Sequence, residues 1–391
     1  MNQLEQVTLL IADISGYTEY LAGVEIDHAQ DILADLIGTV VTSLRPAFRL
    51  AKLEGDAAFC FAPADKVDGS TLLDTIERCY FSFRRRRRDV RAATSCECNA
   101  CMRIPTLNLK FVAHRGVVIR QKVAGHEELL GSDVIVLHRL LKNDIVETLG
   151  VPAYAALTAT LTSAVGIDPA ALGMTHHSQA YEHVGEVPIW VLDLEKRWQE
   201  EESRQRVYFS PADAAFNMEL QINAPPQVVW DFLTTPGRRL GWQGLTGTTG
   251  IEQQPGDGGR RGAGTVTHCA HGEAMVIEEI LDYRPNDYIT MRSTNPLIPF
   301  KLVMMFELEP TGTGTHMSFR VERPKKPEHV AALEQFGTHL GEALTAAYHL
   351  MGVQAVTEAK ELTLGPPQPA LLEARNADGF LNAITPIQML N

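Results

Sequence analysis

The sequence predicts an α+β protein with two domains. In the first part of the chain, apolar strand-like runs alternate with helical patterns, which favours a sheet with helices on one face. In the second part, one strand and short helical segments precede a series of strands and one long helix. We expect domains at residues 1–195 and 210–362, a charged linker helix at 196–209 and a Pro-rich tail at 363–391.

Helical periodicity and apolar runs predict the elements of the first domain. Apolar residues recur at helical spacing over residues 29–44 and 72–83, which indicates two amphipathic helices. Residues 107–118 are expected to form two strands with a turn near residues 114–116. The alternation of such strands and helices is typical of an α+β sheet domain.

Two further strand-like runs each border an aspartate. Residues 9–12 are followed by Asp13-Ile14-Ser15-Gly16-Tyr17-Thr18, and Lys52-Leu53-Glu54-Gly55-Asp56 precedes residues 57–61. We expect the two aspartates to meet on neighbouring strands that the intervening helix joins. Two convergent carboxylates suit a hard cation such as Mg²⁺, with phosphate oxygens completing its coordination shell. The backbone N–H groups that follow Ser15 and Gly16 could face that phosphate, because a helix starts there.

These motifs resemble those of the class III nucleotidyl cyclases. The first metal aspartate of that family lies in Asp-Ile-x-Gly-Phe-Thr, matched here with Tyr17 in place of Phe, and the second lies in Lys-x-x-Gly-Asp, matched by residues 52–56. Gly131, Val134 and Arg139 reproduce the spacing of the family's Gly-x-x-Val-Asn-x-x-x-Arg helix. The resemblance covers roughly residues 5–195 and implies a ferredoxin-like cyclase sheet.

The resemblance also implies roles for individual residues and a homodimer, since class III cyclases place their sites between two chains. Arg139 would stabilise the transferring phosphoryl group if the site is active. The residues implied to bind Mg²⁺ or Mn²⁺ are Asp13 and Asp56, and those implied to bind the nucleotide are Ser15, Gly16, Lys52 and Glu128.

Two departures from the family pattern weaken the chemistry that it implies. The family's transition-state Asn falls on Ile135, which cannot donate a hydrogen bond to ribose, and its phosphate-binding Lys falls near Val184 and Gly185. Loss of one such donor typically lowers the rate by ~10²–10³. We therefore expect binding of a nucleotide or cyclic nucleotide with little turnover. An active adenylyl cyclase of altered mechanism is the alternative.

The second domain has the element order of a helix-grip fold. Ala224-Pro225-Pro226 opens a helix, because proline suits the first helical turn. We expect strands over residues 216–222, 265–268, 274–281, 288–293, 301–308 and 315–321, and a long helix over residues 327–359.

This order, with the segments 224–233 and 278–288, resembles the START-like (SRPBCC) superfamily of polyketide cyclases and lipid-transfer proteins over roughly residues 210–360. Members commonly hold apolar ligands between sheet and helix, so the resemblance implies an apolar small-molecule ligand. Glu273, Glu278 and Arg320 either line that cavity or face solvent. A polyketide cyclase-like enzyme sited here is a further alternative, as is an interaction module with both sites vestigial.

Three cysteines, Cys96, Cys98 and Cys101, lie within six residues. Thiolates at this spacing can hold one Zn²⁺ if a fourth ligand arrives from elsewhere, while a redox role and three reduced thiols remain open. Candidates for the fourth ligand are Cys79, His114, His126 and a partner chain.

Five consecutive arginines, Arg84–Arg88, spread around a whole helix circumference, so they are either a solvated helix end or an anion-binding segment.

Composition limits the class of partner. The net charge of −13 disfavours binding to bulk nucleic acid or anionic membranes. The chain has no apolar run of ~18 residues for a membrane span, and its first ten residues include Glu5 and no basic residue, which argues against a secretory signal. We expect a cytoplasmic signalling or regulatory protein. Its cyclase-like domain would bind a nucleotide with a divalent cation, and its START-like domain an apolar small molecule.

Overall fold

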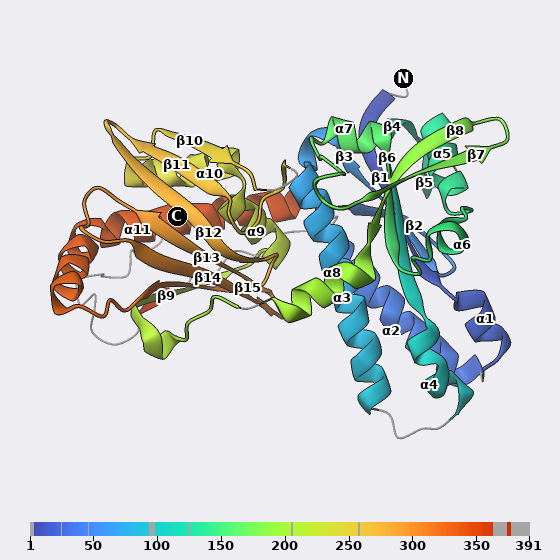
Figure 1. Ribbon diagram of the computed structural model, residues 1–391, viewed down its shortest axis with the longest axis horizontal. Coiled ribbons are helices and arrows are strands. Elements are labelled where there is room, and N and C mark those ends of the chain that lie inside the picture. The colour runs from blue at the N-terminus through green and yellow to red at the C-terminus, as the bar shows by residue number, and fades with distance from the viewer. Residues whose placement is uncertain are drawn as a thin grey trace. The chain divides into compact units, whose positions relative to one another are not determined.

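The computed structural model describes residues 4–24, 26–45, 47–93, 98–123, 126–204, 206–256, 259–362 and 374–376. The chain separates into two compact units, residues 1–204 with 257–260 and residues 205–256 with 261–391 (Figure 1). Each unit contains one sheet and several helices, so the predicted α+β class with two domains is confirmed.

The first unit is built on a mixed sheet. Its described strands are β1 (Leu4–Ser15), β2 (Arg49–Glu54), β3 (Ala57–Pro63), β4 (Asn108–Val123), β5 (His126–Leu130), β6 (Tyr154–Thr158), β7 (Thr175–Tyr181) and β8 (Gly185–Asp193). They are ordered β2-β3-β1-β4-β6-β8-β7, and β5 pairs with β4 outside this path. The β4–β6 pair is parallel, and the other described pairs are antiparallel.

Helices cover both faces of this sheet. They are α1 (Tyr17–Ala22), α2 (Ile26–Leu44), α3 (Gly69–Ala93), α4 (Asn99–Arg103), α5 (Ser132–Leu140), α6 (Ile145–Leu149), α7 (Ala159–Ala164) and α8 (Leu194–Ser203), with 3₁₀ turns at Ala64–Lys66 and Ile104–Thr106. Leu10 of β1 belongs to the core formed with α2, α3, α4 and α8, whereas Leu9 belongs to the core formed with α5 and α6. Helices α2 and α3 run side by side (Figure 1). The prediction of helices on one face is wrong, because a strand as continuously apolar as β1 is buried on both faces.

The predicted helices over residues 29–44 and 72–83 are present as α2 and the longer α3. The predicted turn near residues 114–116 is absent, because β4 continues through them. His114 pairs with Leu9 and Gly116 pairs with Val7 of β1. A glycine is needed at position 116, since a Cβ there would lie 2.3 Å from Cβ of Asp133.

The arginine run of α3 contacts neighbouring elements. The Nη2 atom of Arg84 lies 2.9 Å from Oε1 of Glu195, and the guanidinium of Arg85 lies 5.5 Å from the ring centre of the buried Trp198. These contacts attach α8, so the charged segment expected to be a linker packs on the first unit. Within the same run, Arg86 pairs with Asp35, Arg87 donates to the carbonyl oxygen of Leu107, and Arg88 pairs with Asp89 and Glu202. The run therefore serves packing, and these contacts do not favour an anion site.

The second unit is an antiparallel sheet with a long helix. Its strands, β10 (Gly250–Gln254), β11 (Val266–His271), β12 (Ala274–Arg284), β13 (Tyr288–Thr294), β14 (Leu302–Thr311), β15 (Gly314–Glu322), β9 (Ala214–Ile222) and β16 (Ala374–Asn376), lie in that order in the sheet. Its helices are α9 (Pro226–Thr234), α10 (Pro236–Gln243) and α11 (Pro327–Leu362), with 3₁₀ turns at Pro211–Asp213 and Gly244–Thr246. The predicted strands and the long helix are confirmed.

The core of the second unit lies between α11 and the sheet. Tyr348 and Met351 of α11 pack with Phe306 and Phe319 of β14 and β15 in one apolar cluster. Helix α11, orange to red in Figure 1, runs along this sheet. Of the predicted tail, residues 363–373 and 377–391 lie outside the described residues, and Ala374–Asn376 pairs with β9.

The β14–β15 hairpin offers a matched test of how closely β15 approaches its neighbour β9. A Cβ at Gly314 would lie 2.2 Å from the carbonyl oxygen of Ile222, whereas a Cβ at Gly312 would meet nothing within 4 Å. We expect Gly314→Ala to lower the free energy of unfolding by about 1–3 kcal/mol, as overpacking does, and Gly312→Ala to change it by less than about 0.5 kcal/mol. Thermal and urea unfolding of the two variants measure this. Equal stability would contradict the close approach of β15 to Ile222.

Candidate functional site

The structure brings the two predicted aspartates together. Asp13 lies in β1 opposite Ala57 of β3, and Asp56 occupies the turn just before β3. The backbone N–H of Ile14 donates to the carbonyl oxygen of Asp56 at 3.3 Å. Burial, together with the charge and hydrogen bond of Asp13, raises the pKa of Asp56 to about 6. Asp13 does not end its strand as predicted, since β1 continues to Ser15.

The ammonium group of a lysine, Lys110, lies beside this carboxylate pair. Lys110 of β4 pairs with Asp13 across the ladder, and its Nζ lies 3.0 Å from Oδ2 of Asp13. The two side chains are only 20% and 16% exposed. An ammonium at this position competes with a metal ion for the carboxylate oxygen. Lys110 was not predicted as a site residue, although it is the one charged residue in the apolar segment 107–112.

A recess of about 320 Å³ lies beside Asp56. Gly16 precedes α1 in the left-handed region with φ 85°, which glycine adopts without strain. The described residues that line the recess include no lysine or arginine. They are Ile14, Tyr17, Leu21, Gln30, Leu33, Ala34, Ile37, Gly55 and Asp56. The recess therefore offers a carboxylate for a cation and few side-chain donors for a phosphate.

Lys52 and Glu128, two of the residues implied to bind the nucleotide, also come together. Nζ of Lys52 lies 3.6 Å from Oε2 of Glu128 and 3.2 Å from Oε1 of Glu54. The hydrogen bond to Glu54 is the largest cause that raises the pKa of Lys52. Glu54, which was not predicted as a site residue, also has its Oε2 3.0 Å from Nε2 of His138.

Helix α5 carries the residue expected to act in catalysis. Arg139 lies in its last turn, one turn beyond Ile135, whose side chain is 56% exposed. No described ion pair joins Arg139 to Asp13 or Asp56. The exposed apolar side chain of Ile135 thus occupies the position of the family's Asn, as the sequence indicates.

The predicted zinc site gains no support. Cys96 and the side chain of His126 lie outside the described residues, Cys98 precedes α4 and Cys101 is buried on it. His114 contacts Thr158 and Asp133, 2.9 and 3.3 Å away. Among the described residues, no group of three or more His, Cys, Asp or Glu side chains could hold a metal ion. The Asp13–Asp56 pair offers two carboxylates at most.

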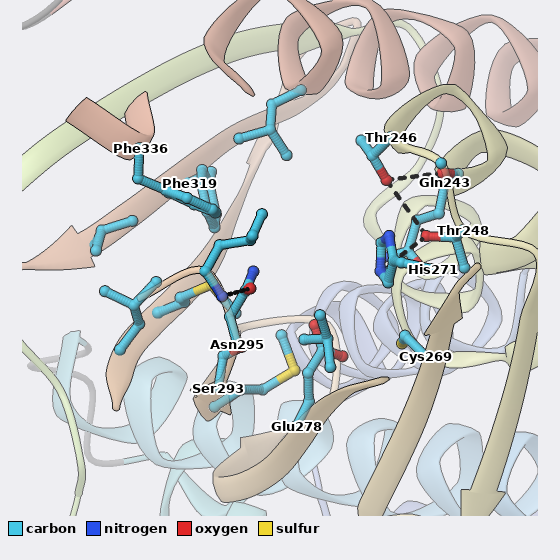
Figure 2. A pocket seen from close by; sticks show the side chains of 18 of the residues that line it. Gln243, Thr246, Thr248, Cys269, His271, Glu278, Ser293, Asn295, Phe319 and Phe336 are labelled. Carbon is cyan, nitrogen blue, oxygen red and sulfur yellow. Dashed lines mark hydrogen bonds between the residues drawn. The ribbon is translucent and has the colours of Figure 1, made fainter. Parts of the chain in front are cut away.

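The second unit contains a cavity of about 620 Å³. Figure 2 shows Phe319 and Phe336 on one side of it and Gln243, Thr246, Thr248 and His271 on the other. Most of the lining is apolar or aromatic, including Phe216, Leu233, Trp242, Val276, Met291, Leu302, Phe306, Val321, Leu333 and Leu344. Glu278 lines the cavity, whereas Glu273 is not part of the lining and Arg320 pairs with Glu307 at 2.7 Å.

A buried ion pair forms part of the cavity wall. Nη2 of Arg239 donates to Oε2 of Glu278 at 2.6 Å, and the two residues are 4% and 8% exposed. Burial acts to lower the pKa of Arg239, but the carboxylate of Glu278 outweighs it and the pKa is raised. Arg239 was not found from the sequence, since its role depends on its partner on β12.

The raised pKa of Asp56 gives a pH test. The pKa of the Asp56 carboxyl is about 6 in the folded state, above its usual value of 3.8, so the folded state binds the carboxyl proton more tightly than the unfolded state does. The stability that protonated Asp56 contributes is therefore present below about pH 4 and is lost as the pH rises through 6. We expect Asp56→Asn to raise the melting temperature at pH 7.5 and to change it little at pH 4. Asp65→Asn, at an exposed position, is the matched control. A stabilisation by Asp56→Asn of the same size at both pH values would contradict the raised pKa.

No described helix combines the length and apolar character that a membrane crossing needs.

Residues 213–350 match the family described as polyketide cyclase / dehydrase and lipid transport, which confirms the predicted resemblance of the second domain. Residues 33–148 match a family described as a protein of unknown function, DUF2652.

Similar solved structures include adenylyl and guanylyl cyclases. A bacterial light-regulated adenylyl cyclase is 13% identical, with 53% of this chain and 55% of that chain covered and a TM-score of 0.38. The adenylyl cyclase CyaB from P. aeruginosa is 13% identical, with 49% and 96% covered and a TM-score of 0.34.

A curated relative is closer in sequence. The uncharacterized protein Rv2561/Rv2562 of Mycobacterium tuberculosis is 34% identical over 164 residues, which are 41% of this chain and 73% of that protein. The chain belongs to the family of this mycobacterial protein.

Proposed function

We propose that this chain is a cytoplasmic regulatory protein that binds an apolar small molecule in the cavity of its second unit. The observation that carries the proposal is the cavity itself. Its volume of about 620 Å³ lies within the ~300–1,000 Å³ typical of small-molecule sites. An apolar ligand that leaves water for such a lining gains binding energy in proportion to the apolar area that it buries.

The polar groups of the lining favour binding over catalysis. The carboxylate of Glu278 is paired with Arg239, so it is not poised as a general base. Burial raises the pKa of the Cys269 thiol to about 12, which leaves it protonated at neutral pH. His271 lies 3.4 Å from Oγ1 of Thr248. A polyketide cyclase-like activity here remains the alternative, and it would need His271 as its acid or base.

Two neighbouring residues of β12 test ligand binding. Ala274 lines the cavity, and Met275 is exposed and is not part of the lining, because successive strand residues point to opposite faces. We expect Nile red, a neutral apolar dye, to bind the full chain, and Ala274→Trp to weaken binding at least about tenfold by filling the cavity. Met275→Trp is the control and should leave the affinity unchanged. Fluorescence titration measures the affinity, and circular dichroism checks that both variants fold.

If the wild-type chain binds no dye, the ligand-binding proposal is wrong. If both tryptophan variants weaken binding equally, the dye binds outside the cavity.

We also propose that the first unit binds a nucleotide or cyclic nucleotide together with Mg²⁺ or Mn²⁺. Two contacts support this: the carboxylates of Asp13 and Asp56 interact, and Lys52 lies 3.6 Å from Glu128. The ammonium of Lys110 and the apolar Ile135 both argue against fast turnover. The homodimer that the resemblance implies stays a prediction, which native mass spectrometry tests.

Nucleotide assays separate binding from catalysis. We expect Mn²⁺-dependent binding of ATP or GTP that Asp13→Asn with Asp56→Asn abolishes, because the cation loses both carboxylates. Lys110→Met should strengthen Mn²⁺ binding, since it removes the competing ammonium. Calorimetry measures binding, and chromatography measures the cyclic product, which should be absent or form very slowly. Robust wild-type turnover that depends on Asp13 and Asp56 would instead establish an active cyclase.

A further inference from the structure

Two cysteines of the first unit lie one helical turn apart. Cys98 directly precedes α4, and Cys101 lies within it. The backbone N–H of Met102 donates to the carbonyl oxygen of Cys98 at 3.0 Å, so the turn begins at Cys98. Residues i and i+3 of a helical turn have Cα atoms about 5 Å apart, and a disulfide joins residues whose Cα atoms are ~4.4–6.8 Å apart. The backbone of this turn therefore suits a disulfide.

The two side chains also face the same part of the core. Cys101 belongs to the apolar core that includes α2, α3, α4 and α8, and Cys98 packs against that core. Both residues carry a thiol. Because residues three apart lie on one face of a helix, we expect the two sulfur atoms to be neighbours.

Exposure distinguishes Cys98 from the other cysteines that the structure describes. Cys98 is half-buried, whereas Cys60, Cys79, Cys101 and Cys269 are buried. Burial raises the pKa of the Cys60 and Cys269 thiols to about 12, and it also raises the pKa of Cys79. The thiolate is the form that attacks a disulfide, so these three thiols are poorly reactive at neutral pH.

Helix α4 contacts α1, which borders the recess beside Asp56. The hydroxyl of Tyr20, a buried residue of α1, donates to the carbonyl oxygen of Ala100 in α4 at 2.9 Å. Helix α1 also contributes Tyr17 and Leu21 to the lining of the recess. A helix of five residues has little stability of its own, so a cross-link in α4 would also hold α1 more firmly.

We propose that Cys98 and Cys101 form a reversible disulfide when a small-molecule disulfide oxidises them, and that this disulfide stabilises α4 and α1. The cross-link acts by restricting the conformations that α4 can adopt when it unfolds locally. The inference does not rest on a ligand in either unit, so it is independent of the proposed function.

The chemistry is thiol–disulfide exchange in two steps. The thiolate of the more exposed Cys98 attacks one sulfur of the small disulfide, whose S–S bond breaks and releases one thiolate. The thiolate of Cys101 then attacks Sγ of Cys98 in the mixed disulfide and releases the second thiolate. The protein loses two electrons and the small disulfide gains them. The two protons of the protein thiols pass to the two released thiolates.

Oxidised glutathione and dithiothreitol test the proposal on the full chain. We expect peptide mapping by mass spectrometry to find a disulfide between Cys98 and Cys101 after oxidised glutathione, and none after dithiothreitol is added. Hydrogen exchange at the amides of α4 and α1 should be at least about threefold slower in the oxidised chain.

Three alanine variants control the test. Cys98→Ala and Cys101→Ala should each abolish the disulfide and give the same exchange rates with either reagent. Cys96→Ala makes the same change two residues before Cys98 in the sequence and should keep both effects. Circular dichroism checks that the variants fold.

Three results would overturn the inference. If oxidised glutathione leaves both thiols reduced in the wild-type chain, the pair is not redox-active. If Cys96 is joined to either residue instead, the helical turn does not determine the pairing. If the disulfide forms but exchange in α1 is unchanged, the cross-link does not act on that helix.

Discussion

A charge that is removed from water must be balanced nearby, and this constraint arranges both candidate sites. In the first unit, Asp13 and Asp56 share one region of limited exposure, and Lys110 balances Asp13 at 3.0 Å. In the second unit, Arg239 and Glu278 balance each other at 2.6 Å in the wall of a largely apolar cavity. In each unit, the fold supplies the opposite charge from a neighbouring element.

The origin of the balancing charge differs between the two sites. Lys110 reaches Asp13 because β1 pairs with β4, so the ammonium is fixed by the sheet and a metal ion must compete with it. This arrangement lowers cation affinity relative to a bare carboxylate pair. For the proposed nucleotide–metal complex, this competition would favour reversible binding over the fixed two-metal geometry that phosphoryl transfer requires.

The structural features that were predicted correctly are those that depend on a local pattern of residues. The helical spacing of residues 29–44 predicted α2, and the meeting of Asp13 with Asp56 followed from motifs that border adjacent strands. The prediction of a turn near residues 114–116 was wrong, because β4 continues to pair with β1 through Gly116 although glycine favours turns. Neither Lys110 nor Arg239 was predicted, since each acquires its role from a partner distant in sequence, and periodicity does not report such partners.

The polar side of the second cavity follows from the same constraint. An ion pair enclosed by apolar side chains is weak evidence for stability, because well-packed apolar residues often serve as well. Removal of either partner alone would leave the other charge buried and unpaired, so the two residues depend on each other. The pair balances its own charge, because Nη2 of Arg239 donates to Oε2 of Glu278 at 2.6 Å. The wall of this cavity therefore has a polar side without a net charge from the pair, and the rest of its lining is mostly apolar.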